Sequence, residues 1–64
     1  MNTTLNPNTL IGTFKRFGEF GIAYEVIDVG QEPNAKETMV RIHVFDTGEE
    51  LDYPVRLYLE DIAA

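Results

Sequence analysis

The segment from Glu37 to Phe45 constrains the fold more than any other part of this sequence. Its aliphatic residues Val40, Ile42 and Val44 recur at every second position, with larger or charged side chains between them. Successive side chains of a β-strand point to opposite faces, so this spacing places the three residues on one face. The segment is therefore expected to be a strand with one buried face, as in an antiparallel sheet.

A hairpin is predicted directly after this strand. Residues 46–49 read Asp-Thr-Gly-Glu, and Gly48 supplies the positive φ that such a tight turn requires. Residues 50–53 are then expected to return as a short strand. In that register Leu51 and Tyr53 join the buried face.

Two earlier strands are predicted at 11–17 and 22–29, where β-branched and aromatic residues are frequent. A tight connection at 18–21 joins them. The polar sequence GQEPNAK at 30–36 is predicted to be a loop, because it contains glycine, proline and asparagine.

The segment before Gly18 also fits a second interpretation. Leu10, Phe14 and Phe17 follow helical spacing, and Gly18 would suit the position after a helix end. Gly12 and the threonine after it are poor helix residues and favour the strand.

A short C-terminal helix is predicted after Tyr53. Pro54 suits the first turn of a helix, where its missing N–H is not needed, and Asp52 is a candidate cap. The helix must dock on the sheet through one apolar stripe, formed by Val55, Tyr58, Leu59 and Ile62.

These elements predict an α+β protein that is mainly β: a small antiparallel four-stranded meander, curled or barrel-like, with a short C-terminal helix. Residues 1–9 are expected to be a flexible lead and residues 10–64 a single small domain. A chain of 64 residues has room for one domain, and without cysteine it must be stabilised by one apolar core.

The chain carries no sign of export or membrane insertion. No apolar run approaches the roughly 20 residues of a membrane span, and residues 1–8 lack the positive charge and apolar core of a signal peptide. The protein is therefore expected in the cytoplasm of a bacterial host cell.

The residues that would support catalysis are sparse. His43 is the single histidine, lies in the middle of a predicted strand and has no serine or cysteine nucleophile at a recognisable spacing. No cluster of histidines and carboxylates has the spacing of metal ligands. The sequence is therefore expected to be that of a binding protein without catalytic residues, metal or cofactor.

Negative charge is concentrated in the last third of the chain. The net charge is −6, and residues 46–64 hold six carboxylates against one arginine. One interpretation is that these acids keep a small protein soluble. The other is that they imitate phosphates and enter a basic groove built for nucleic acid. The candidate contacts are Glu49, Glu50, Asp52, Glu60 and Asp61.

A second candidate surface lies earlier in the chain, in the sequence FKRFGEFG at 14–21 together with Tyr24, where aromatic residues are interleaved with basic ones. Such residues on a strand pair can stack nucleic-acid bases, whereas in an ordinary small sheet they form core. Phe20 is expected to be exposed at a loop tip between Glu19 and Gly21, where it would suit an interface anchor.

The sequence GTFKRF at 12–17, followed by GEFGI at 18–22, resembles the opening of cold-shock domains. That resemblance implies a small five-stranded barrel that binds single-stranded nucleic acid through Phe14, Lys15, Phe17, Phe20 and Tyr24. It covers about eleven residues. The second aromatic motif of those domains is missing from 37–45, and a C-terminal helix does not belong to them.

The sequence TGEELDYP at 47–54, together with the earlier FGEFG and the YEV at 24–26, resembles a family of short bacterial proteins of unknown function. In size and charge the chain is also similar to small phage-encoded inhibitors, including anti-CRISPR proteins and DNA mimics.

The expected function is that of a small acidic inhibitor or regulator that binds a basic nucleic-acid-binding protein or complex. Reversal of Glu49, Glu50 and Asp52 to lysine is expected to abolish binding and leave the fold intact. Alternatives are a cold-shock-like single-stranded nucleic-acid binder and an antitoxin-like accessory protein. The leading hypothesis expects no direct binding of nucleic acid or membrane, and a monomer or weak homodimer.

Overall fold

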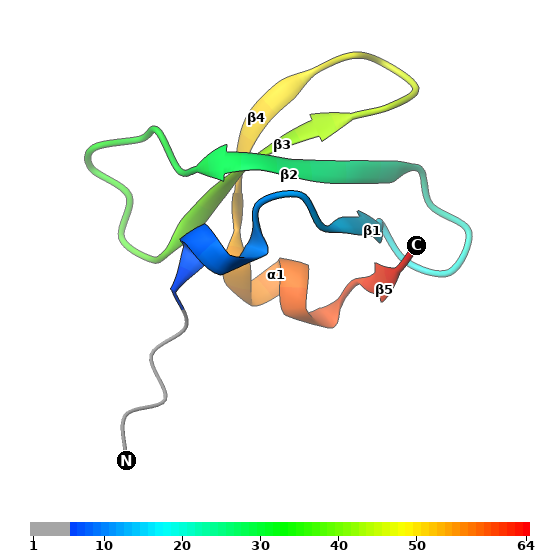
Figure 1. The fold of residues 1–64 in the computed structure, drawn as a ribbon, viewed down its shortest axis with the longest axis horizontal. Coiled ribbons are helices and arrows are strands. Elements are labelled where there is room, and N and C mark those ends of the chain that lie inside the picture. Colours follow the sequence, from blue (N-terminus) through cyan, green and yellow to red (C-terminus); the bar gives the residue numbers. More distant parts are fainter. Residues whose placement is uncertain (1–5) are drawn as a thin grey trace.

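The computed structural model describes residues 6–64 as one antiparallel sheet with two short helical segments (Figure 1). Residues 1–5 of the predicted flexible lead lie outside this range. The strands are β1 (Phe14–Arg16), β2 (Ala23–Val29), β3 (Met39–Val44), β4 (Glu50–Pro54) and β5 (Ile62–Ala63). The helical segments are a 3-10 turn, η1 (Pro7–Leu10), and an α-helix, α1 (Val55–Glu60). Neither helical segment within residues 6–64 is long and apolar enough to cross a membrane.

The middle of the sheet follows the predicted alternation. Ile42 of β3 lies between Val26 of β2 and Leu51 of β4. Val40, Ile42 and Val44 are at most 5% exposed, which confirms the buried face of β3. The turn between β3 and β4 holds a glycine, Gly48, with a φ of 75°, as the sequence predicts.

The core lies on one side of the sheet, called here the inner face, and the helix α1 contributes to it. Its aromatic centre is formed by Phe17, Tyr24 and Tyr53, whose ring centroids lie 4.5 to 5.4 Å apart. The buried residues are Tyr24, Val26, Val40, Ile42, Val44, Val55 and Tyr58. Burial of each such side chain stabilises the fold by about 1.5–3 kcal/mol, so a few residues carry much of the stability.

The first strand is shorter than predicted. The expected strand at 11–17 is reduced to Phe14–Arg16, because Gly12 has a φ of 92° and turns the chain just before it. The Thr13 hydroxyl donates to the Leu10 carbonyl at 2.6 Å and fixes this turn. Only Pro7–Leu10 is helical, so the alternative helix does not extend to Phe17.

The start of α1 differs from the prediction at its cap. Pro54 occupies the N-cap position, just before the helix, and its side chain makes no capping bond. The backbone N–H of Val55 donates instead to the Thr38 carbonyl at 3.0 Å. The predicted cap, Asp52, is wrong because its carboxylate is bound to the loop between β2 and β3.

The structure at the end of α1 differs from the prediction in two respects: the residues of the apolar stripe and the number of strands. Asp61 adopts an extended conformation and ends the helix after six residues, so Ile62 belongs to β5 and pairs with Arg16 of β1. Leu59 is 59% exposed and does not join the core. The predicted four-stranded meander is therefore a five-stranded sheet.

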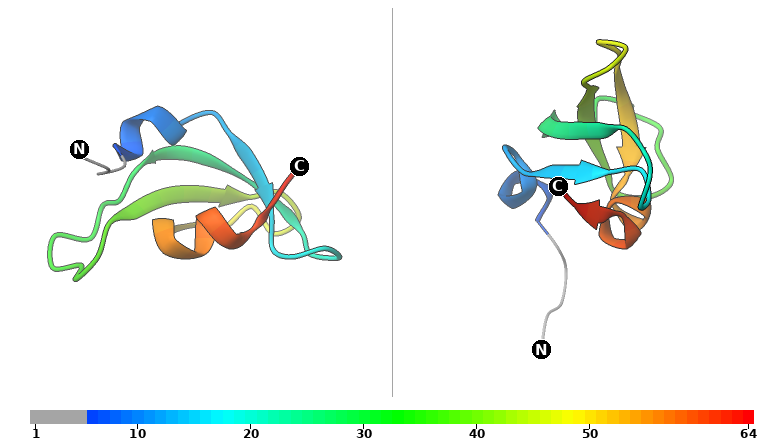
Figure 2. Two further views of the ribbon diagram at one scale, coloured as in Figure 1. Left: turned by 90° about the horizontal axis from the view of Figure 1, so that it is seen from below. Right: turned by 90° about the vertical axis from the view of Figure 1, so that its right-hand side faces the viewer.

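The connection through α1 explains how the sheet curls. The strand order is β4-β3-β2-β1-β5, so α1 carries the chain from one edge strand to the strand at the opposite edge (Figure 2). The remaining strands form the predicted antiparallel meander. The sheet is curled but not closed into a barrel, because β4 and β5 remain its two edges.

Candidate protein-binding surface

Two loops that hold predicted contact residues lie at one end of the sheet. In an antiparallel meander, the β1–β2 and β3–β4 connections occupy the same end, and the β2–β3 loop occupies the other. Residues 17–22 and 45–49 accordingly share the end that Figure 1 shows opposite the loop at 30–38. Phe20 and Glu49 therefore lie in two loops at the same end of the sheet, although 29 positions separate them in sequence.

Three acids of the β3–β4 hairpin face solvent: Asp46, Glu49 and Glu50, here called the hairpin acids. The Thr47 hydroxyl orders the turn by accepting from the Glu49 backbone N–H at 3.2 Å and donating to the Glu49 carboxylate at 3.3 Å. No lysine or arginine occurs between residues 42 and 55. The hairpin is thus a hydrogen-bonded turn whose acids have no lysine or arginine beside them in sequence.

Phe20 is 96% exposed at the tip of the β1–β2 loop, as the sequence predicts. The Phe17 backbone N–H donates to the Ile22 carbonyl at 3.1 Å, and the Gly21 N–H donates to the Gly18 carbonyl at 3.2 Å. A Cβ atom at Gly21 would overlap the backbone carbonyl of Phe17. The loop is therefore a tight, hydrogen-bonded turn that presents an unshielded aromatic ring.

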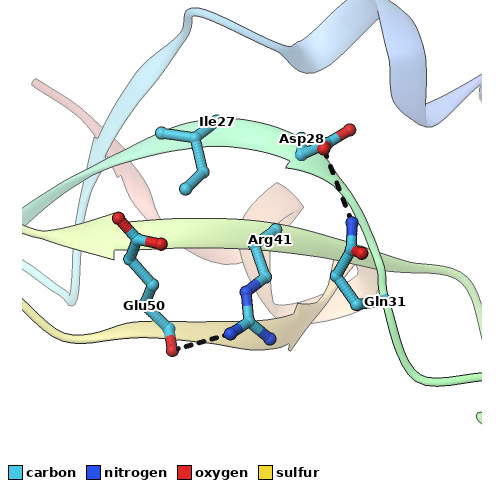
Figure 3. A pocket seen from close by; sticks show the side chains of 5 residues that line it. All are labelled: Ile27, Asp28, Gln31, Arg41 and Glu50. Carbon is cyan, nitrogen blue, oxygen red and sulfur yellow. Dashed lines mark hydrogen bonds between the residues drawn. The ribbon is translucent and has the colours of Figure 1, made fainter.

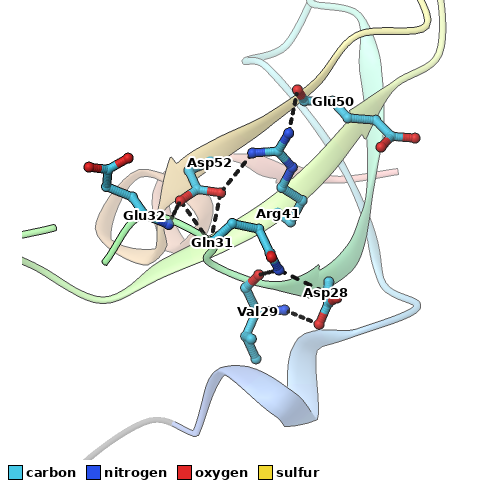
Figure 4. Close-up of polar contacts among 7 residues, drawn as sticks. All are labelled: Asp28, Val29, Gln31, Glu32, Arg41, Glu50 and Asp52. Carbon is cyan, nitrogen blue, oxygen red and sulfur yellow. Dashed lines mark hydrogen bonds and ion pairs between the residues drawn. The ribbon is translucent and has the colours of Figure 1, made fainter. Parts of the chain in front are cut away.

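Asp52 does not belong to the solvent-facing acids. Its carboxylate accepts the backbone N–H groups of Gln31 and Glu32 at 2.7 to 3.0 Å (Figure 4). It also accepts from the Arg41 guanidinium at 3.1 Å, and its side chain is only 12% exposed. Asp52 therefore fastens the β2–β3 loop to β4, and its replacement by lysine would disturb the fold itself.

Replacement of Asp52 with asparagine is expected to make the free energy of unfolding depend less on pH in the acid range. Burial opposes ionisation of Asp52, but the Gln31 and Glu32 N–H groups and Arg41 outweigh it and hold the pKa of this carboxyl below its ordinary value. A lowered pKa stabilises the fold above the unfolded value of about 3.9, and this contribution disappears as the pH falls through the native value. The variant should lose about 1–2 kcal/mol at pH 7 and converge with the parent in acid. Urea unfolding from pH 7 to pH 2 measures this.

An exposed acid provides the control for that series. Asp46→Asn removes a carboxylate that faces solvent and should leave both the stability at pH 7 and its pH dependence close to the parent's. If the Asp52 and Asp46 variants had identical curves, Asp52 would not anchor the loop.

Asp61 is likewise engaged within the molecule. One oxygen of its carboxylate, Oδ2, accepts from the hydroxyls of Tyr24 at 2.6 Å and Tyr53 at 2.7 Å. Burial and the hydrogen bond to Asp61 raise the pKa of Tyr53 to about 12 and also raise that of Tyr24. The Lys15 ammonium donates to the Asp61 backbone carbonyl at 3.0 Å. Asp61 therefore joins the end of α1 to β1, β2 and β4.

Glu60 is exposed, whereas its neighbour Asp61 is turned toward the tyrosines. The two acids at the end of α1 thus do not form one outward-facing pair. Of the five predicted acidic contacts, the structure brings Glu49 and Glu50 together on the hairpin and leaves Glu60 exposed on the helix. Asp52 and Asp61 hold elements of the fold together.

An aromatic group on the other side of the sheet, called here the outer face, was not predicted as a unit, although Phe14 was among the candidate base-stacking residues. The rings of Phe14 and Phe45 stack at 5.7 Å between centroids, and His43 meets Phe45 edge-on at 5.7 Å. Phe14 and Phe45 are 46% and 44% exposed. These three residues are called here the aromatic patch. The alternation of β3 already placed His43 and Phe45 away from the core, but it gave no sign that Phe14 would meet them across β2.

The predicted base-stacking surface is divided between the two faces. Phe14 lies on the outer face, whereas Phe17 and Tyr24 pack together in the core. Lys15 also points inward, with its ammonium 4.6 Å from the centre of the Tyr58 ring. Neighbouring strand residues point to opposite faces, so Phe14 and Arg16 lie on the outer face and Lys15 on the inner face, and the predicted residues do not form one surface.

An open pocket of about 450 Å³ lies farther along the outer face, lined by Ile27, Asp28, Gln31, Arg41 and Glu50 (Figure 3). The Arg41 guanidinium crosses it and donates to the Glu50 backbone carbonyl at 3.2 Å. Arg41 also pairs with Asp52, so this cation is already neutralised. Within residues 6–64, no three histidine or carboxylate side chains converge as metal ligands.

The fold and surface together define a class: a small, mainly β domain with an acidic hairpin and an exposed aromatic loop. The chain belongs to a family of unknown function, DUF5397, whose model matches residues 2–64. A search of curated proteins finds no match. Membership therefore supports the resemblance to a family of unknown function and brings no activity with it.

Proposed function

We propose that this protein is a small non-catalytic regulator that binds the basic surface of a nucleic-acid-handling protein in the bacterial cytoplasm. The observation that supports this proposal is the exposure of the three hairpin acids on a hydrogen-bonded turn that holds no lysine or arginine. Carboxylates on a rigid element attract a basic groove without first having to be ordered, and they compete there with phosphates. Inhibition of a phage-defence complex, as by anti-CRISPR proteins, is the most specific form of this proposal.

Phe20 complements the hairpin acids in this proposal. Protein interfaces commonly combine a buried aromatic anchor with charged residues at the rim. The loop that holds Phe20 lies at the same end of the sheet as the hairpin acids, and Phe20 is 96% exposed, so its ring can enter an apolar pocket of the partner. The acids would orient the partner, and the ring would slow its dissociation.

Charge reversal at Glu49 and Glu50 tests this function. The double variant Glu49→Lys/Glu50→Lys should retain the fold, because both residues are exposed, and should bind the partner at least 100-fold more weakly. The tagged protein is incubated with nuclease-treated lysate of its host, and retained proteins are identified. The proposal expects a basic nucleic-acid-handling protein that is released as salt is raised.

The matched control reverses two exposed acids at the other end of the sheet. Glu32→Lys/Glu37→Lys produces the same net charge and breaks only one exposed ion pair, between Glu37 and Arg56. This control should retain the partner. Equal retention by both double variants would refute the proposal, and equal loss would show that total charge, rather than the hairpin, determines binding.

A further inference from the structure

The aromatic patch on the outer face lies beside two carboxylates, those of Glu25 and Glu50. Phe14, Glu25, His43 and Glu50 are aligned directly across four adjacent strands, so they project from the same face. Glu25 makes no side-chain hydrogen bond or ion pair within residues 6–64. Glu50 reaches only His43, at 3.5 Å. The face therefore offers exposed rings flanked by two carboxylates.

A small residue brings the two phenylalanine rings together. The Phe45 backbone N–H donates to the Ala23 carbonyl at 3.1 Å, which sets Ala23 of β2 beside Phe45. Phe14 lies opposite Glu25, two residues further along β2. Because Ala23 has only a methyl side chain, the rings of Phe14 and Phe45 can stack above it.

The cations of the chain itself do not cover these rings. Arg16 lies on the same face but donates to the Glu19 carbonyl at 3.4 Å, and Arg41 is held by Asp52. Within residues 6–64, the one cation stacked on an aromatic ring is Lys15, over Tyr58 on the other face. The rings and the Glu25 carboxylate are thus available to a cation from outside.

We propose that the outer face binds an arginine side chain of the protein partner, stacked on Phe14 and Phe45 and paired with Glu25 and Glu50. A guanidinium satisfies both parts of the site, because its flat surface stacks on aromatic rings and its N–H groups donate to carboxylates. Glu50 is itself one of the hairpin acids and Phe45 precedes Asp46 directly, so the arginine would belong to the same basic surface. The inference rests on the proposed function, and it specifies the side chain with which the partner contacts the outer face.

Titration with two peptides, followed by NMR of the labelled protein, tests this inference. Gly-Arg-Gly-Arg-Gly should shift the ring signals of Phe14 and Phe45 and should bind several-fold more tightly than Gly-Lys-Gly-Lys-Gly, which has equal charge but stacks less well. Phe14→Leu/Phe45→Leu should remove this preference and weaken arginine-peptide binding about fivefold, while the chain stays folded. Leu59→Ala, which changes an exposed apolar residue of α1 outside the patch, should retain both the preference for arginine and the affinity for the arginine peptide.

The outcomes separate this inference from the proposed function. Equal binding of the two peptides, without a change in the ring signals, would overturn the arginine contact. Shifts of the same signals on dilution without peptide would assign the face to a second copy of the chain and would also overturn it. If the arginine preference were absent while partner capture still depended on Glu49, only this inference would fail. If capture failed while the preference remained, the outer face would still bind arginine, but the proposed nucleic-acid-handling partner would be wrong.

Discussion

Replacement of Asp61 with alanine is expected to lower the free energy of unfolding by about 2–4 kcal/mol. The change leaves the hydroxyls of Tyr24 and Tyr53 without their shared acceptor, and an unsatisfied buried donor costs about 1–3 kcal/mol. The total stability of a domain of this size is about 3–10 kcal/mol. Urea unfolding at pH 7 should therefore show a much earlier midpoint for the variant.

The adjacent acid is the control for this effect. Glu60→Ala removes an exposed carboxylate from the same end of α1 and should change the stability by less than about 0.5 kcal/mol. Tyr53→Phe should lie between the two, because Tyr24 then still donates to Asp61. If the Asp61 and Glu60 variants were equally stable, the contact between Asp61 and the tyrosines would not hold the C-terminal strand.

Replacement of Gly21 with alanine is expected to cost about 2–3 kcal/mol and to disturb the loop that presents Phe20. The added methyl group would overlap the backbone carbonyl of Phe17, and backbone cannot move aside as a flexible side chain can. The loop must then open, which also alters the position of Phe20 at its tip. Thermal unfolding and the amide spectrum of residues 17–22 measure the two effects.

Gly18→Ala separates steric overlap from conformational preference. Gly18 has a φ of 83° but open space where a Cβ would lie, so alanine there should cost only about 1 kcal/mol. Equal costs at the two positions would contradict the close approach of Gly21 to Phe17.

The strands in the middle of the sheet were predictable because their signals are local. Val40, Ile42 and Val44 repeat with the period of a strand, and Gly48 marks the turn. The fifth strand was not predictable in this way. Ile62 and Ala63 carry no pattern of their own, and they become a strand only because α1 delivers them to the free edge of β1.

The candidate site was harder to predict because the roles of its acids depend on distant residues. Asp52 binds a loop that precedes it by about 20 positions, and Asp61 binds Tyr24 from 37 positions away. Charge counting cannot distinguish these carboxylates from Glu49, which faces solvent. The exposure of Phe20 was predictable, because a ring at a glycine-bounded loop tip has no neighbours to pack against.

Competition between this protein and DNA for the captured partner would test charge mimicry most directly. The partner is held with fluorescently labelled DNA, and the protein is added at increasing concentration and at two salt concentrations. Our account predicts that the parent protein displaces the DNA, that added salt weakens its binding to the partner, and that Glu49→Lys/Glu50→Lys displaces none. A complex that contains the partner, the DNA and this protein together, with the DNA affinity unchanged, would contradict it.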